Sequence, residues 1–118
     1  MNTLLATLFL SRDIAHKEHL ATSSYAAHTA LGGFYIEVID IADKLAELYS
    51  GRTGERITNI PYYGNPSQST VVELLGTILE QIQESRLEIM PDDSVVQSVF
   101  DDLEVLFSST LYKLRFLK

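Results

Sequence analysis

"GRTGERITNIPYYGNPSQ", residues 51–68, decides the fold of this chain. It holds three glycines and two prolines, and it separates two long stretches in which apolar residues recur at helical spacing. A segment of this length without regular structure needs a reason in a compact domain. Extended residues span about 3.3 Å each and helical residues rise about 1.5 Å, so this segment can return the chain along the full length of a helix. We therefore interpret it as a crossover.

Helical periodicity predicts four helices, at residues 3–20, 24–49, 69–84 and 94–116. Local signals agree with these ends, because small polar residues cap helix N-termini and glycine commonly follows a C-terminus. The expected caps are Ser23 or Ser24, Gly51, a residue of "SQST" at 67–70, and Asp92 or Asp93. Four helices thus account for almost the whole chain outside the crossover.

The lengths of the connections predict the topology. The first and third connections are short, which predicts two antiparallel helical hairpins. A single long connection between the hairpins is typical of a ferritin-like four-helix bundle, whereas an up-and-down bundle needs no long link. The predicted fold is all-α, one ferritin-like domain of residues 1–118 with short, long and short connections. "IPYY", residues 60–63, is expected to pack on the bundle, with a subunit contact as the alternative.

The composition excludes several kinds of chemistry. No cysteine occurs among the 118 residues, which excludes disulfides, thiolate metal sites and cysteine nucleophiles. The net charge is −7 and the nine Lys and Arg residues are scattered, which disfavours direct binding to nucleic acid. No apolar run is long enough to span a membrane, and "MNTLLATLFLSRD" lacks the basic region and cleavage site of a signal peptide. A cytoplasmic protein is expected, with Asp101, Asp102 and Glu104 solvated.

All three histidines lie at the corner between the first two helices, around "HLATSSYAAH", residues 19–28. One interpretation is structural, since a histidine at a corner often bonds to a helix end. The other is a metal site, because imidazole and carboxylate suit iron, zinc or manganese. A di-iron centre inside one bundle takes Glu-x-x-His from two helices, and only "DIAH", residues 13–16, approximates this pattern. An intra-bundle di-iron centre is therefore not expected.

Asp43 and Glu47 lie on the same side of the second helix as His28, about 60° and 100° around the axis from it. His28 and Asp43 are nevertheless separated by about 22 Å along that axis, so one chain cannot bring them together. A two-fold dimer that pairs this helix antiparallel with its mate can do so.

The segment "HLATSSYAAHTALGGFYIEVIDIADKLAELYSG" resembles the first hairpin of the Dps mini-ferritins, over about residues 12–51. The resemblance implies an iron site between subunits, with His19, His28, Asp43 and Glu47 at the matching positions. The chain departs from the Dps pattern where Leu20 replaces a tryptophan and Gly32 replaces a ligand aspartate. His16 matches the Dps spacing to His28, while His19 matches by context. The lysine-rich DNA-binding tail of Dps is absent.

Two motifs give a second resemblance, to a phage-encoded family of small ferritin-like proteins of unknown function. The first, "H-x-x-T-x-S-Y-A-x-H-x-A-L-G-x-F-Y", occupies His19–Tyr35, and the second, "T-L-Y-K-L", occupies Thr110–Leu114. The resemblance implies a location in the host cytoplasm or on the virion. "ALGGFY", residues 30–35, places two glycines inside a helix, each costing about 1 kcal/mol relative to alanine. We expect a close approach of the first helix or of a second subunit to offset this cost.

Two functions fit these residues. The first is a non-catalytic homo-oligomer, joined through the first two helices, that binds a host or virion protein. Its aromatic contact candidates are Tyr25, Tyr35, Tyr62 and Tyr63. The alternative is Dps-like binding of iron or zinc between subunits, with iron oxidation as the reaction if the site is redox-active. The incomplete ligand set favours the first, and no nucleophile elbow or phosphate-binding loop supports another catalytic class.

Overall fold

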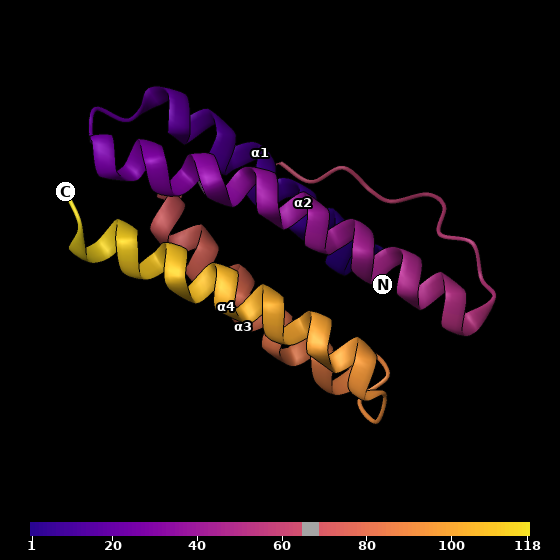
Figure 1. The fold of residues 1–118 in the computed structure, drawn as a ribbon. Helices are drawn as coiled ribbons and strands as arrows, with labels where there is room; N and C mark the ends of the chain where they lie inside the picture. Colours follow the sequence, from indigo (N-terminus) through magenta and orange to yellow (C-terminus); the bar gives the residue numbers. More distant parts are fainter. Residues whose placement is uncertain (65–68) are drawn as a thin grey trace.

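The computed structural model describes residues 1–64 and 69–118. It contains four helices, α1 (Asn2–Ala21), α2 (Tyr25–Thr53), α3 (Val71–Glu88) and α4 (Ser94–Phe116), and no strand occurs in the described residues (Figure 1). The helices form an elongated bundle with extents of 45 × 26 × 21 Å. The predicted all-α class with four helices is confirmed.

The order of helices around the bundle explains the long connection. The helix α1 packs on α2 and α3, and α4 packs on the same two helices, so α2 and α3 lie diagonally opposite. Figure 1 shows that each packed pair is antiparallel, whereas α2 and α3 run in the same direction. A chain that leaves the end of α2 must therefore travel back along the bundle and pass over an intervening helix before α3 can begin.

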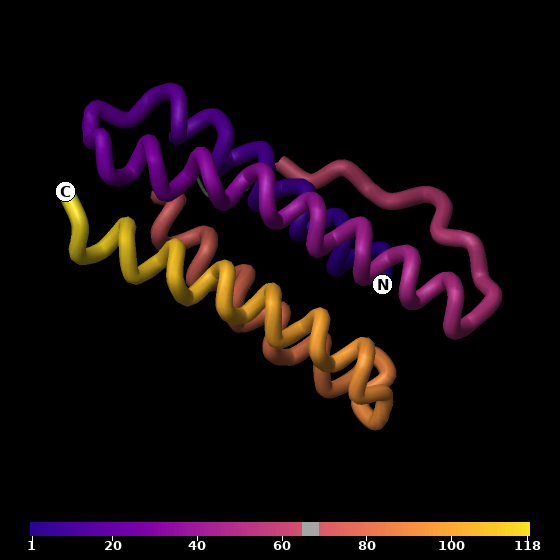
Figure 2. The backbone as a smooth tube through the Cα atoms, in the orientation of Figure 1, coloured from indigo at the N-terminus to yellow at the C-terminus, as the bar shows by residue number. Residues whose placement is uncertain are grey.

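The connection passes over α1. Figure 2 shows the segment after α2 running back along the bundle. The side-chain amide of Asn2 donates to the carbonyl oxygen of Thr58 at 2.7 Å, and Ile57 and Ile60 pack against the core. Within "IPYY", the expected packing on the bundle is therefore present at Ile60, whereas Tyr62 is fully exposed and Tyr63 is 44% exposed. Residues 65–68, which include part of the predicted cap "SQST", lie outside the described residues.

Most helix N-termini follow the local capping signals. Side-chain oxygens of Ser24, Thr70 and Asp93 accept hydrogen bonds from backbone N–H groups in the first turns of α2, α3 and α4. The bounds of α4 agree with the predicted 94–116. The predicted starts of the other three helices lie within two residues of those observed.

Two predicted C-termini are wrong. The helix α2 continues past Gly51 to Thr53, and Gly54 takes the left-handed conformation with φ of 74°. Either glycine satisfies the local signal, and the second one terminates the helix. The helix α3 extends to Glu88 rather than residue 84, because the carbonyl groups of its last turn find partners in α4.

Arg86 and Gln97 join α3 to α4 by reciprocal bonds. The side-chain amide of Gln97 donates to the carbonyl oxygens of Arg86, Ile89 and Met90, which satisfies acceptors left open at the end of α3. The Arg86 guanidinium donates to Gln97 and to the carboxylates of Glu104 and Asp101. These bonds, first to Glu104, raise the pKa of Arg86.

The expectation that three acidic residues of α4 are solvated is wrong for Glu104, whose side chain is 27% exposed. It holds for Asp101 and Asp102, whose side chains are 67% and 55% exposed. Asp101 and Glu104 both pair with Arg86. Asp102 lies 4.0 Å from the ammonium nitrogen of Lys44 on α2, with both side chains largely exposed.

The core lies between the four helices. Phe34 on α2 and Phe107 on α4 meet edge to face with ring centroids 5.0 Å apart. Phe100, Leu45 and Ile82 are among the fully buried side chains that fill the remaining layers. A search of the described residues finds no helix that is long and apolar enough to cross a membrane.

Asp93 couples the ends of α2 and α4. Arg52, in the last turn of α2, donates to its carboxylate at 2.8 Å. The bond from Arg52, followed by those from the backbone N–H groups of Val96 and Val95, holds the pKa of Asp93 below its ordinary value. A carboxyl group with a lowered folded-state pKa stabilises the fold above its unfolded pKa of about 3.9, and this contribution is lost as the pH falls through the folded-state pKa.

We therefore predict that Asp93→Asn, which keeps a cap acceptor but removes the charge, lowers the free energy of unfolding near neutral pH. The difference from the parent should shrink as the pH falls below about 4, where both side chains become neutral. Urea unfolding followed by circular dichroism across the acidic range measures it. Asp92→Asn, at the exposed neighbouring position, serves as the control, and a difference independent of pH would contradict the role of the Asp93 charge.

Candidate functional site

The corner between α1 and α2 is short and closed by its own side chains. Thr22 is extended, with φ of −68° and ψ of 144°, and its hydroxyl oxygen accepts a bond from the backbone N–H of Ser24 at 3.1 Å. The Ser24 hydroxyl oxygen in turn accepts a bond from the N–H of Ala27, in the first turn of α2. These bonds turn the chain so that the last turn of α1 faces the first turn of α2.

His19 and His28 bond to each other's backbone across this corner. The Nδ1 atom of His19 lies 2.6 Å from the carbonyl oxygen of His28, and Nδ1 of His28 lies 2.8 Å from the carbonyl oxygen of His19. Their rings stack with centroids 3.8 Å apart and an interplanar angle of 16°. Because a carbonyl oxygen only accepts hydrogen bonds, each Nδ1 must carry the proton and donate. The geometry therefore supports the structural interpretation of these histidines.

His16 and Tyr35 extend the pair into a cluster of four rings. The His16 ring stacks on Tyr35 with centroids 4.1 Å apart, and Tyr35 presents an edge-on contact to His19 at 5.4 Å. His16 and His19 have centroids 6.3 Å apart. Tyr35 thus contributes to packing between α1 and α2, in addition to its expected role as a contact candidate.

The two adjacent glycines of α2 have different surroundings. A Cβ atom at Gly32 would lie 3.0 Å from Cε1 and 3.2 Å from Nδ1 of His19, closer than such atoms normally approach. A Cβ atom at Gly33 would have nothing within 4 Å. The expected close approach of the first helix is therefore present at Gly32, where it is made by an imidazole ring. Residues 1–64 and 69–118 provide no contact that requires Gly33.

The four predicted metal ligands do not meet within one chain. His19 and His28 lie at the corner, whereas Asp43 and Glu47 are exposed farther along α2. In residues 1–64 and 69–118, no three His, Asp or Glu side chains are grouped so that they could hold a metal ion. This separation agrees with the axial distance calculated from the sequence. A metal site built from these residues requires a second subunit.

A groove lies between α1 and α3, on the side over which the crossover passes. Its volume is about 870 Å³. Leu4, Leu74 and Ile78 contribute to its floor, and Glu84 and Glu88 contribute carboxylates. Tyr62 and Tyr63 of the crossover also line it, and the lining residues among those described include no lysine or arginine. Sequence periodicity could not reveal this groove, because it depends on which two helices the crossover leaves side by side.

Comparison with known protein families identifies the family of this chain. A protein family described as "Family of unknown function (DUF5856)" matches residues 19–114. The chain belongs to this family. The matched range begins at His19 and ends at Leu114, so it contains both sequence motifs and the histidine corner.

A second finding relates the chain to a bacteriophage protein. The chain is 28% identical over 110 residues to an "Uncharacterized 14.6 kDa protein in mobD-ri intergenic region" of Enterobacteria phage T4. The alignment covers 93% of this chain and 84% of the T4 protein. No solved structure matches the chain. The expected relation to a small phage protein of unknown function is supported at this level.

We predict opposite effects for alanine at the two glycines. In the monomer, Gly33→Ala should raise the free energy of unfolding by roughly 0.5–1 kcal/mol, because alanine favours the helix and has open space there. Gly32→Ala should lower it, because the new methyl group displaces a His19 ring that is held by bonding and stacking. Chemical denaturation measures both.

A double-mutant cycle tests the cause. In a His19→Ala background the penalty for Gly32→Ala should disappear, whereas the effect of Gly33→Ala should be unchanged. Equal effects of Gly32→Ala in both backgrounds would contradict the contact between Gly32 and the His19 ring.

Proposed function

We propose that this protein is a non-catalytic, homo-oligomeric scaffold of ferritin-like topology that binds a host or virion protein during phage infection. The observation that carries the binding proposal is the groove between α1 and α3. Its apolar floor, its tyrosines and its two carboxylates, with no lysine or arginine among the described lining residues, suit a basic amphipathic segment. We propose that the partner is met in the host cytoplasm or on the virion, and that it is neither nucleic acid nor membrane.

The arrangement of helices supports the ferritin-like part of the proposal. Two antiparallel hairpins are joined by one crossover, and the helices that it links, α2 and α3, are parallel and diagonal. This connectivity is typical of ferritin-like bundles. The hairpin α1–α2 carries the exposed residues Leu20, Tyr25 and Ile36, which support oligomerisation through these two helices.

One observation favours the alternative, a metal site between subunits. Metal-binding histidines commonly donate one ring N–H to a carbonyl group, which leaves the other nitrogen for the metal. His19 and His28 both donate from Nδ1 to a backbone carbonyl, so Nε2 of each neutral ring is available as a ligand. Asp43 and Glu47 of a second subunit would complete the set, with iron or zinc as the metal.

Gly32 limits how closely such a site could resemble that of Dps. A carboxylate at this position needs a Cβ atom, and the His19 ring occupies the space that the Cβ atom would take. The stacked histidine pair and a ligand at position 32 are therefore incompatible in this conformation. This supports the scaffold as the first proposal and metal binding as the second.

The scaffold proposal predicts a charge-dependent interaction at the groove. Glu84→Lys with Glu88→Lys should abolish capture of the partner from phage-infected cell extract, because both substitutions place a cation beside the groove. Glu80→Lys makes the same kind of change at an exposed position of α3 outside the groove and should preserve capture. Affinity capture with mass spectrometry, at low and high salt, measures the effect. No specific partner at either salt, or equal capture by all variants, would contradict the proposal.

The metal alternative predicts that Fe(II) or Zn(II) remains bound to the oligomer after reconstitution and desalting. Asp43→Asn with Glu47→Gln should remove it without disturbing the fold, since both side chains are exposed. Elemental analysis measures the metal content, and Glu80→Gln, at an exposed position of α3, is the control. Retention of metal by the double variant, or its absence from the parent protein, would exclude this site.

A further inference from the structure

The side of the bundle formed by α2 and α4, which faces the viewer in Figure 1, carries apolar side chains that this chain does not cover. On α4, Val105, Tyr112 and Phe116 are 68%, 55% and 71% exposed. Their spacing of seven and then four residues places them on one stripe. On the neighbouring α2, Ile36 is 58% exposed. Contiguous exposed apolar side chains of this kind mark an interaction surface.

Gly33 lies on the same side of the bundle and suggests that another molecule packs closely against α2 there. It is exposed, and a Cβ atom there would meet nothing within 4 Å. A glycine in a helix interior destabilises the helix relative to alanine, and here no contact in the described part of the chain requires it. A helix of another molecule that packs closely against α2 at this point would give Gly33 a reason. Gly32 differs, because the His19 ring already occupies the space beside it.

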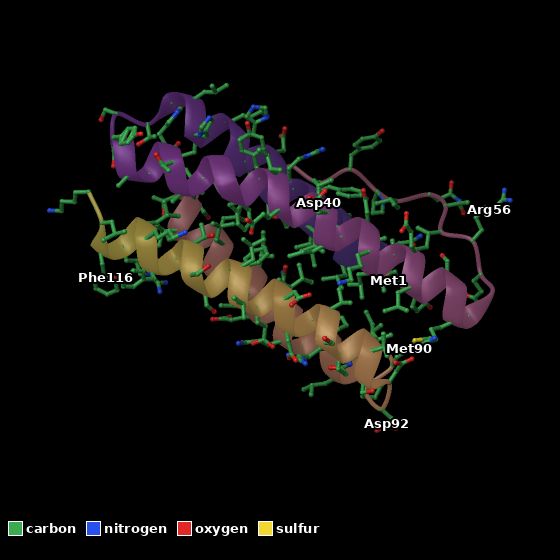
Figure 3. All side chains as sticks on the ribbon, in the orientation of Figure 1. Met1, Asp40, Arg56, Met90, Asp92 and Phe116 are labelled. Carbon is green, nitrogen blue, oxygen red and sulfur yellow. The ribbon has the colours of Figure 1, made fainter. Side chains whose placement is uncertain are left out.

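The charged residues on this side lie at several levels, with Glu37 between Gly33 and Asp40 on α2. The pair Lys44–Asp102 fixes the register, because it places these positions of α2 and α4 at the same level. The two helices are antiparallel (Figure 1). Lys113 lies eleven residues after Asp102 on α4, and Gly33 lies eleven residues before Lys44 on α2. Lys113 and Gly33 are therefore at the same level along the bundle. Asp40 lies beyond Ile36, toward the Lys44 level. Figure 3 labels Asp40 on α2 and Phe116 near the end of α4.

We propose that this side of the bundle binds a second copy of the same chain, with a two-fold axis that crosses the helices at the level of Ile36. Such an axis pairs α2 with α2 and α4 with α4, each antiparallel. It brings Lys113 of one copy toward Asp40 of the other, with Ile36 near the centre. This inference rests on the proposed homo-oligomeric function and specifies its surface.

The size and geometry of the surface suit a stable dimer. A standard interface buries about 800 Å² on each partner, and a bundle with extents of 45 × 26 × 21 Å offers that area on one long side. The antiparallel pairing of α2 is also the pairing that the metal alternative requires. The two proposals remain separable, because the dimer uses α4 and the metal site does not.

Sedimentation velocity of the full chain, from about 1 to 100 µM, tests the dimer. The parent protein should sediment as twice the 13.2 kDa monomer. Gly33→Gln and Val105→Glu should each raise the dissociation constant about tenfold or more, since each places a polar or charged group in the interface. Both positions are exposed in the monomer, so circular dichroism should show an intact fold. Leu87→Glu, at an exposed apolar position of α3, is the matched control and should dimerise normally.

A charge exchange tests the register. Lys113→Glu and Asp40→Lys should each weaken the dimer, and the double variant should restore it. A parent protein that is monomeric throughout would overturn both this surface and the homo-oligomeric proposal. A parent dimer that is unaffected by Gly33→Gln and Val105→Glu would overturn this surface alone. Weakening by these two variants without restoration in the double variant would overturn the antiparallel register.

Discussion

The reciprocal bonds between His19 and His28 determine the geometry of the α1–α2 hairpin. Each ring donates to the backbone of the other residue, so rotation of either ring breaks its Nδ1–H hydrogen bond. The stacked rings also need room against α2, which is available because Gly32 has no side chain. One pair of contacts thus fixes the angle of the corner, the identity of a residue in α2 and the ring nitrogens that remain free.

The other hairpin uses the same physical solution with different residues. At the α3–α4 turn, Gln97 satisfies carbonyl groups at the end of α3, and Arg86 donates back to α4. In both hairpins, polar side chains of one helix bond to the backbone of the other helix at the turn between them. The two hairpins are then joined by a crossover that Ile57 and Ile60 attach to the core. The bundle therefore consists of two helical hairpins, each held at its turn by its own hydrogen bonds, that share one apolar core.

The sequence predicted best what depends on neighbouring residues. The limits of α4 agree with expectation because the Asp93 cap and the apolar periodicity act within the helix itself. The end of α2 was misplaced because Gly51 and Gly54 give the same local signal, and packing decides which of them adopts the left-handed conformation. Arg86 and Gln97 could not be predicted, since their partners belong to another helix whose register only the folded bundle sets.

The candidate site illustrates the same limit, and it also shows where function should be sought. Helix geometry alone showed that His28 cannot reach Asp43, and the structure agrees that the two remain apart in one chain. The histidine corner, which attracts attention in the sequence, is largely occupied by its own hydrogen bonds. The adjacent glycines differ in their surroundings: Gly32 faces the corner and accommodates the His19 ring, whereas Gly33 is exposed and meets no contact among the described residues. Because packing within the described bundle accounts for the first glycine and not for the second, the proposed interface includes the exposed side of α2.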